Sequence, residues 1–127
     1  MLQKNIPIFR IFDEGKAREF YIGWLGFTIE WEHRFEASMP LYMCIKKDDI
    51  QIHLSEHYGD ATPGSKVFII CNDIKNYYAE LQSRPYNYYR PGLEKTFYGA
   101  LCIEVHDPFG NRLSFNEYLN KDEETDD

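Results

Sequence analysis

Few side chains of this 127-residue chain could do chemistry, and they are spread along the sequence. His53 could act as a base or bind a metal, and Cys44 or Cys102 could serve as a nucleophile beside it. The sequence offers no positively charged setting that would lower a thiol pKa. It also contains neither a G-x-S-x-G motif nor a glycine-rich phosphate loop. We therefore assign no catalytic residue and interpret these cysteines, with Cys71, as small core or pocket residues.

The four histidines are poorly spaced to share a metal. His53 and His57 are four residues apart in a segment that reads as a strand leading into a loop. In a strand that spacing separates side chains by roughly 13 Å, so a shared metal would need a sharp turn between them. His33 and His106 stand beside polar residues and are expected to face solvent or to lie in turns. The histidine spacing therefore does not favour a shared metal site, and adventitious binding by His53 and His57 stays open.

Charge and hydropathy limit the partners of the chain. The 14 Lys and Arg residues against 21 Asp and Glu residues give a net charge of −7, which argues against nucleic acid and anionic membrane partners. No apolar run approaches the roughly 18 residues of a membrane span, and the first ten residues lack the features of a signal peptide, so a cytoplasmic location is expected. Residues 121–127 hold five acids and one lysine and are expected to form a disordered tail.

The elements that position these side chains occur in the same order twice. The first half predicts a strand, a helix and three strands at residues 5–12, 14–25, 27–34, 41–45 and 50–55. The second half predicts a strand at 66–71, a helix, a short strand near Tyr86–Tyr89, and strands at 100–105 and 112–118. Asp13 and Asp73, 60 residues apart, stand where helix N-caps would lie.

This repeat predicts an α+β fold made of two tandem βαβββ units. The units span about residues 5–56 and 65–118, within a single domain of residues 1–120. Each unit is expected to pack a helix on one face of its sheet, so that a curved mixed sheet surrounds a groove.

Alternation along the strands predicts which side chains face that groove. If Leu101, Ile103 and Val105 pack on a helix, the opposite face carries a different set: Tyr98, Ala100, Cys102 and Glu104. The same reasoning turns Tyr42, Cys44, His53 and Ser55 toward the groove. In residues 27–34, however, alternation places Trp31 with the apolar Phe27 and Ile29, and Glu30 with Thr28 and Glu32. Aromatic rings with carboxylates nearby could stack on a planar ligand and neutralise a cationic group.

Two motifs add a family resemblance to this order of elements. FYIGWLGF at residues 20–27 and HDPFGNRLSF at residues 106–115 resemble motifs of the vicinal oxygen chelate superfamily, which includes glyoxalases, extradiol dioxygenases and bleomycin resistance proteins. The resemblance covers residues 5–118. The segment from Trp31 to Arg34 and the stretch LSEHYGDATPGS at residues 54–65 are most similar to the glyoxalase/bleomycin resistance branch.

The resemblance also implies where a metal would be held. Enzymes of this superfamily bind a divalent metal with four side chains, one from each of four inner strands. In this sequence the four positions correspond to Ile6, His53, Lys66 and Ser114. Only His53 is a good ligand, because isoleucine has no donor atom, lysine is protonated and a single serine hydroxyl binds weakly. The resemblance therefore favours a protein that is not an enzyme and needs no cofactor.

Bleomycin resistance proteins bind a cationic, aromatic glycopeptide without a metal, in grooves between the subunits of a dimer. Resemblance to them implies a homodimer whose small-molecule ligand is bleomycin-like. The ligand-binding residues implied by resemblance and alternation together are Glu30, Trp31, Phe35, Tyr42, His53, Tyr98, Cys102 and Glu104. Exposed residues around Phe35, Met39, Leu41 and Tyr42 could instead serve the dimer interface.

Two alternatives remain open at this point. The first is a metal-dependent lyase or isomerase of the glyoxalase type, with an atypical ligand set that includes His53 with Glu104 or His57. The second is a small-molecule-binding module whose ligand is unrelated to antibiotics, because a fold does not dictate its ligand.

Overall fold

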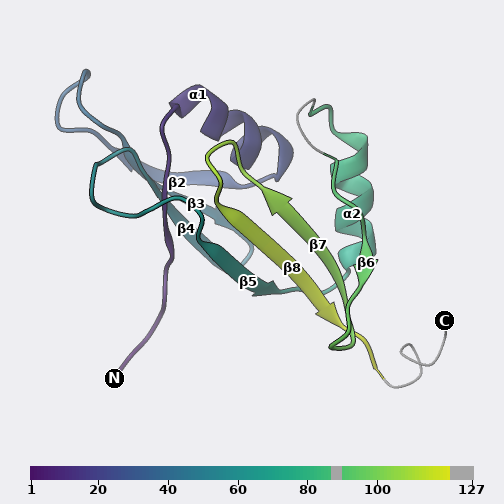
Figure 1. Ribbon diagram of the computed structural model, residues 1–127. Helices are drawn as coiled ribbons and strands as arrows, with labels where there is room; N and C mark the ends of the chain where they lie inside the picture. The colour runs from purple at the N-terminus through teal and green to yellow at the C-terminus, as the bar shows by residue number, and fades with distance from the viewer. Residues whose placement is uncertain (87–89, 121–127) are drawn as a thin grey trace. The chain divides into compact units, whose positions relative to one another are not determined.

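The computed structural model describes residues 1–86 and 90–120, and the chain separates into two compact units (Figure 1). The first unit comprises Met1–Ser65 with Asp107–Asn111, and the second comprises the rest of the chain. Each unit holds a helix and a mixed four-stranded sheet, which confirms the predicted α+β class with two βαβββ units. No helix in the described residues is long and apolar enough to span a membrane.

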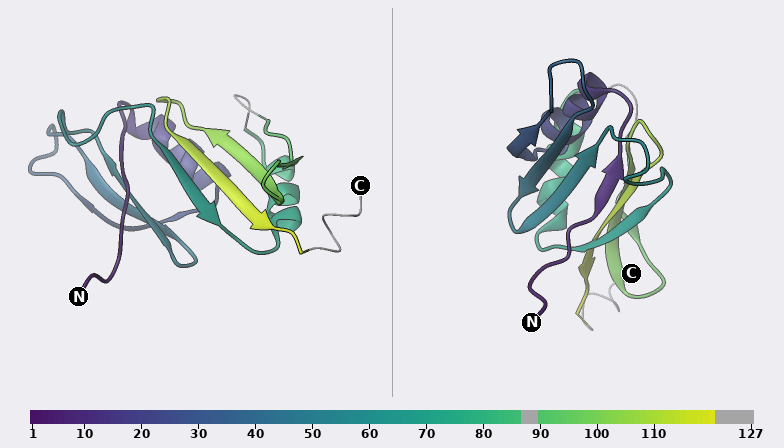
Figure 2. Two further views of the ribbon diagram at one scale, coloured as in Figure 1. Left: turned by 60° about the horizontal axis from the view of Figure 1, so that its bottom comes forward. Right: turned by 90° about the vertical axis from the view of Figure 1, so that its left-hand side faces the viewer.

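The first unit contains a sheet with the strand order β1-β4-β3-β2. Its elements are β1 (Ile8–Arg10), α1 (Glu14–Ala17), the π-helical turn η1 (Arg18–Trp24), β2 (Thr28–His33), β3 (Tyr42–Lys47) and β4 (Ile50–Ser55). Strand β1 pairs with β4 in parallel, and the other pairs are antiparallel. An extended N-terminal segment leads into β1 (Figure 2).

The helical segment of the first unit begins where the sequence predicts. Asp13 caps it, because the Asp13 carboxylate accepts a hydrogen bond from the Lys16 backbone N–H at 2.9 Å. The sequence predicts a single α-helix here, whereas the segment changes from an α-helix to a π-helix, η1, after Ala17. Two consecutive aromatic residues of η1, Phe20 and Tyr21, are fully buried, with their rings edge to face at 4.8 Å. The core beneath this helix includes Phe9, Met43, Ile45, Ile52 and Leu54.

The second unit contains a sheet with the strand order β5-β8-β7-β6. Its elements are β5 (Lys66–Ile70), α2 (Ile74–Ser83), β6 (Glu94–Lys95), β7 (Ala100–His106) and β8 (Arg112–Tyr118). Helix α2 packs on β7 and β8. The short strand predicted near Tyr86–Tyr89 is not found at Tyr86, and residues 87–89 lie outside the described residues, as does the predicted tail at 121–127.

Asp73 occupies the N-cap position of α2 as predicted, but its side chain does not cap the helix. Asp73 adopts a left-handed backbone with φ of 58°, and its side chain makes no capping bond. A capping side chain needs an extended backbone to reach the first helical N–H groups. The Asp73 carboxylate accepts a hydrogen bond from the Asn76 side chain at 2.7 Å instead. The Ile74 N–H at the helix start donates to the Glu117 carboxylate of β8 at 3.0 Å, so a neighbouring strand supplies the cap.

The predicted turn at residues 106–111 is held by one buried carboxylate. Asp107 Oδ1 accepts the backbone N–H groups of Phe109 and Asn111 at 2.9 and 2.8 Å. Asp107 Oδ2 accepts the Tyr21 hydroxyl at 2.7 Å and the Asn111 amide at 2.8 Å. The same amide donates to the Arg10 carbonyl at 2.9 Å. This network ties the turn to η1 and β1 within the first unit.

Replacing this carboxylate tests the network. In Asp107→Asn an NH₂ group replaces one of the two acceptor oxygens. The donors that pointed at that oxygen then face another donor and lose their hydrogen-bond partner. We expect the free energy of unfolding to fall by roughly 2–4 kcal/mol, measured by chemical denaturation. The control Asp49→Asn, in the exposed turn between β3 and β4, should leave stability within about 0.5 kcal/mol of the unchanged protein. Equal stability of the two variants would show that the network contributes little.

Candidate ligand-binding faces of the two sheets

The open face of the first sheet carries aromatic and polar residues across three neighbouring strands. Trp31 of β2, Cys44 of β3 and His53 of β4 are partners in register, so their side chains share one face. His33 and Tyr42 pair in the same way one step along the strands. The opposite face carries the buried residues beneath the helix. Of the eight predicted ligand-binding residues, the first unit therefore holds five: Glu30, Trp31, Phe35, Tyr42 and His53.

The alternation predicted for β2 is wrong beyond Ile29. Ile29 is opposite Ile45, whereas Trp31 is opposite Cys44, the preceding residue of β3, so β2 carries one extra residue, Glu30. Such a β-bulge moves every following side chain to the other face of the sheet. Trp31 therefore lies on the open face with 43% of its surface exposed, rather than in the core.

The bulge also moves the Glu32 side chain, which now lies on the helix-facing side of the sheet. Glu32 pairs in register with the fully buried Met43 and therefore points toward the helix. There it forms an ion pair with Arg18 of η1 at 3.1 Å. Alternation had placed Glu32 on the face of Glu30, so the bulge separates these two carboxylates.

Three rings on the open face contact one another. The Trp31 and Tyr42 rings are nearly parallel, with an interplanar angle of 10° and centroids 5.9 Å apart. The His53 ring stands edge-on to both, with centroid distances of 5.2 Å in each case. The Tyr42 hydroxyl also lies 2.7 Å from His53 Nδ1. This arrangement forms an exposed aromatic surface whose histidine is fixed in place.

The environment of His53 favours its neutral form. Burial lowers the pKa of His53, and the charge of Glu30 partly opposes this effect by raising it. Burial also raises the pKa of Tyr42, so its hydroxyl keeps its proton. The Tyr42 hydroxyl and Nδ1 share one hydrogen bond, whose direction depends on the tautomer of the neutral ring. In either tautomer Nε2 can form one further hydrogen bond with a ligand.

Glu30 places a carboxylate beside the three rings. It accepts hydrogen bonds from the Gln51 amide at 2.5 Å and from the Cys44 thiol at 3.3 Å, and these bonds lower the pKa of Glu30. The amide oxygen of the same Gln51 side chain accepts a hydrogen bond from the Lys4 ammonium group. The carboxylate is therefore ionised at neutral pH. Burial raises the pKa of Cys44 to about 11, which leaves the thiol protonated and unsuited to act as a nucleophile.

Residues between β2 and β3 differ in their exposure. Phe35 is 81% exposed and contacts the His33 ring edge to face at 5.7 Å. Met39 is also exposed. The expectation that Leu41 is exposed is wrong, because its side chain is buried in the core of the first unit. Any interface role of this segment therefore rests on Phe35 and Met39.

The other three predicted residues, Tyr98, Cys102 and Glu104, lie in the second unit. Ile103 and Val105 are buried as predicted, and Cys102 and Glu104 share the opposite face of β7. The Tyr98 hydroxyl donates to the buried Asn116 at 2.6 Å.

Cys102 and Glu104 each have a polar neighbour on this face. Cys102 Sγ lies 3.4 Å from the Ser114 hydroxyl oxygen. Glu104 forms ion pairs with Lys66 at 2.5 Å and with His106 at 3.3 Å. The Lys66 contact is the main reason why the pKa of Glu104 is lowered. The charge of Glu104 is thus already compensated.

The four positions that the family resemblance implies for a metal do not fit one. Ile6 has no donor atom, Lys66 is ion-paired, and the Ser114 hydroxyl accepts the Asn116 amide at 2.9 Å. The Nδ1 atom of His53 is engaged in a hydrogen bond with the Tyr42 hydroxyl. Within residues 1–86 and 90–120, no three His, Cys, Asp or Glu side chains are grouped so that they could hold a metal ion.

Sequence reasoning missed two residues that shape these faces. Gln51 holds the Glu30 carboxylate, and Asn116 accepts the hydroxyl of Tyr98. Both stand two positions from a residue that alternation or resemblance had already selected, His53 and Ser114. Extending the alternation by one step along β4 and β8 would have found them.

Removing the charge of Glu30 tests the electrostatics of the first face. Because Glu30 raises the pKa of His53, Glu30→Gln is expected to lower the pKa of His53 further below its usual value. Histidine ring resonances followed by NMR across a pH titration measure this shift. Glu36→Gln, which removes a charge from the loop between β2 and β3, serves as the control and should leave that pKa unchanged. A rise in the pKa of His53 in Glu30→Gln would contradict this description.

Known structures share the fold of this chain. A bleomycin-binding protein solved with bleomycin is 20% identical with a TM-score of 0.68, and the match covers 93% of this chain and 100% of that one. The bleomycin resistance determinant encoded on the transposon Tn5 is 19% identical with a TM-score of 0.70, covering 94% and 100%. TnmS3, an antibiotic binding protein from Streptomyces sp. CB03234, is 20% identical with a TM-score of 0.66, covering 94% and 99%.

These structures are so low in sequence identity that they show the fold alone. The family is established instead by a match between the sequence and a protein-family model. No curated protein matches the chain. The family model described as "Glyoxalase superfamily protein" matches residues 1–122, nearly the whole chain. Together with the two βαβββ units, this match shows that the chain belongs to the glyoxalase superfamily.

Proposed function

We propose that this protein binds a cationic aromatic small molecule of the bleomycin type, without a metal and without catalysing a reaction on it. The observation that carries the proposal is the nearly parallel pair of Trp31 and Tyr42, of which Trp31 is exposed, with the Glu30 carboxylate beside it. The proposed contacts in the first unit are Glu30, Trp31, Phe35, Tyr42 and His53.

The two parallel rings suit a flat ligand. Trp31 and Tyr42 deviate from parallel by only 10°, so a planar ring in the same orientation could stack on the exposed surface of Trp31. His53 packs edge-on against both rings and restricts their movement. A surface fixed before the ligand arrives loses less conformational entropy on binding than a mobile one.

Glu30 supplies the charge that would select a cation. Its carboxylate is ionised and forms no ion pair with any described residue, so its charge is available to a ligand. The Trp31 ring adjoining it can also attract a cationic group through its face. Glu104 of the second unit differs, because Lys66 already neutralises it. We propose Tyr98, Cys102 and Glu104 as ligand contacts on the second sheet, considered separately from the site of the first sheet.

The comparisons support a binding role. Proteins with this fold include a bleomycin-binding protein solved with its ligand and a protein described as antibiotic binding. The metal-dependent lyase considered from sequence would need donor atoms that Ile6 and Lys66 do not supply. We further propose that the protein acts in the cytoplasm as a homodimer with the ligand groove between subunits, and that Phe35 and Met39 contribute to the interface.

Titration with bleomycin by calorimetry tests this function. The unchanged protein should bind, and Trp31→Ala should weaken binding by at least about tenfold, because a stacking partner is lost. Tyr58→Ala, which removes a more exposed aromatic residue elsewhere in the first unit, should bind as the unchanged protein does. Absence of binding to bleomycin at high concentration would exclude the bleomycin-specific form of the proposal.

The proposed dimer has a separate test. Sedimentation velocity should show a species of about twice the 15.1 kDa chain mass. Phe35→Ser should shift the equilibrium toward monomer, since it removes an exposed apolar side chain from the proposed interface. A protein that sediments as a monomer at all concentrations, with or without bleomycin, would contradict the dimer groove.

A further inference from the structure

The open face of the second sheet carries a row of basic side chains across three strands. Lys66 of β5 and His106 of β7 are both register partners of Arg112, which lies on β8 between them. The three side chains therefore share one face. The residues just beyond this row in β8 and β7, Leu113 and Val105, are buried on the opposite face.

This row keeps an uncompensated positive charge. Glu104 lies one step along β7 from the row and pairs with both Lys66 and His106. Arg112 forms no side-chain hydrogen bond or ion pair with any described residue. The single carboxylate therefore offsets Lys66, and the Arg112 guanidinium has no counterion among the described residues.

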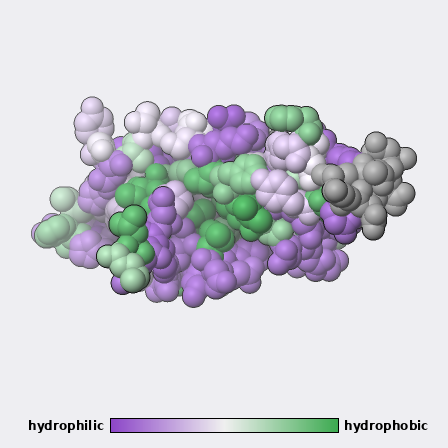
Figure 3. Space-filling view, turned by 90° about the horizontal axis from the view of Figure 1, so that it is seen from below, coloured by the Kyte–Doolittle hydropathy of each residue, from purple (hydrophilic) through white to green (hydrophobic). Residues whose placement is uncertain are grey.

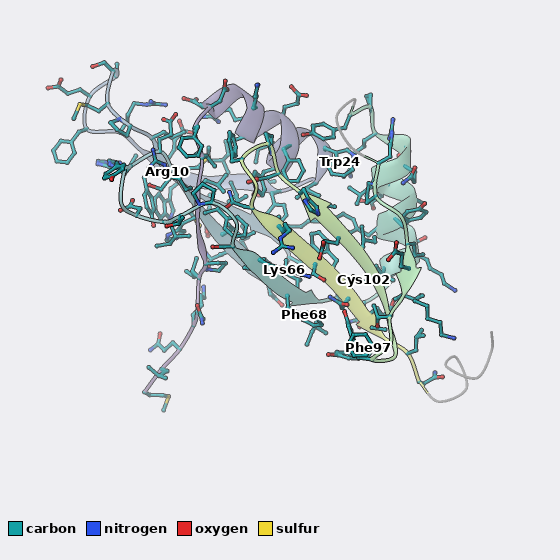
Figure 4. The ribbon with its side chains drawn as sticks, viewed as in Figure 1. Arg10, Trp24, Lys66, Phe68, Phe97 and Cys102 are labelled. Carbon is teal, nitrogen blue, oxygen red and sulfur yellow. The ribbon has the colours of Figure 1, made fainter. Side chains whose placement is uncertain are left out.

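An aromatic cluster adjoins the basic row. Phe68 follows Lys66 by two residues on β5, so it lies on the same face, and both side chains are labelled in Figure 4. Phe68 is 49% exposed. Figure 3 shows one face of the molecule, on which apolar side chains reach the surface among hydrophilic ones. Its ring lies 6.0 Å from that of Tyr98 and 6.4 Å from that of Tyr118. Phe68 is thus the ring of this cluster nearest to the Arg112 guanidinium.

From this juxtaposition we infer that the open face of the second sheet binds an anionic aromatic compound. Its carboxylate or phosphate would bind Arg112, whose planar guanidinium can donate two parallel hydrogen bonds to such a group. Its ring would pack on Phe68. Phe68 and Arg112 are diagonal neighbours on the adjacent strands β5 and β8, roughly 7–8 Å apart, a distance that an acidic group attached directly to a ring can span. This ligand class is opposite in charge to the one proposed for the first sheet.

Two probes with the same ring and different charge test this inference. Calorimetry with 2-naphthoate and the uncharged 2-naphthamide should show that naphthoate binds at least about tenfold more tightly. Arg112→Gln should abolish this preference, and Arg112→Lys should retain part of it. Phe68→Ala should weaken both probes. Lys75→Gln, which removes the same charge from the exposed part of α2, should leave naphthoate binding unchanged.

The outcomes separate this inference from the proposed function. Equal affinity for the two probes, no binding of either, or full naphthoate affinity in an Arg112→Gln variant with an unchanged circular dichroism spectrum would overturn the inference. Trp31→Ala should bind naphthoate normally, because the site does not include the first sheet. If Trp31→Ala loses naphthoate binding, the anion binds elsewhere and the inference is wrong, whereas the result for bleomycin stands independently.

Discussion

The candidate site of the first sheet depends on the one extra residue that β2 carries between Ile29 and Trp31. Without the bulge, Trp31 would face the core and Glu32 would face solvent. With it, Glu30 reaches Gln51 and Cys44, and Trp31 lies parallel to Tyr42. A bulge costs ladder hydrogen bonds, and such features are frequent next to functional sites.

The two sheets have the same order of elements and differ in the charge of their open faces. In the first sheet a hydrogen-bonded carboxylate, Glu30, keeps its charge beside an aromatic surface. In the second sheet the carboxylate of Glu104 is neutralised, and Arg112 has no counterion within residues 1–86 and 90–120. Duplicated units with one backbone plan can therefore present opposite chemistry, because the open-face residues are not constrained by the core.

The sequence predicted what depends on local pattern. The strands Ile50–Ser55 and Arg112–Tyr118 coincide with β4 and β8, and the cap at Asp13 is confirmed. The bulge at Glu30 could not be predicted, because a one-residue shift in register depends on the pairing strand rather than on alternation within β2. Similarly, Asp73 has the residue type of a cap, but its left-handed backbone points its side chain away. For the site, alternation selected Tyr42 and His53, whereas Trp31 was selected only by family resemblance.

We propose that the open face of the first sheet, through Trp31, is the surface that binds a cationic aromatic ligand. NMR of the Trp31 indole N–H during titration with bleomycin tests it most directly, with the resonance assigned by Trp31→Phe and the buried Trp24 as an internal reference. We expect a large, saturable shift of the Trp31 resonance and little change at Trp24. A bound ligand that leaves the Trp31 resonance unchanged would contradict it.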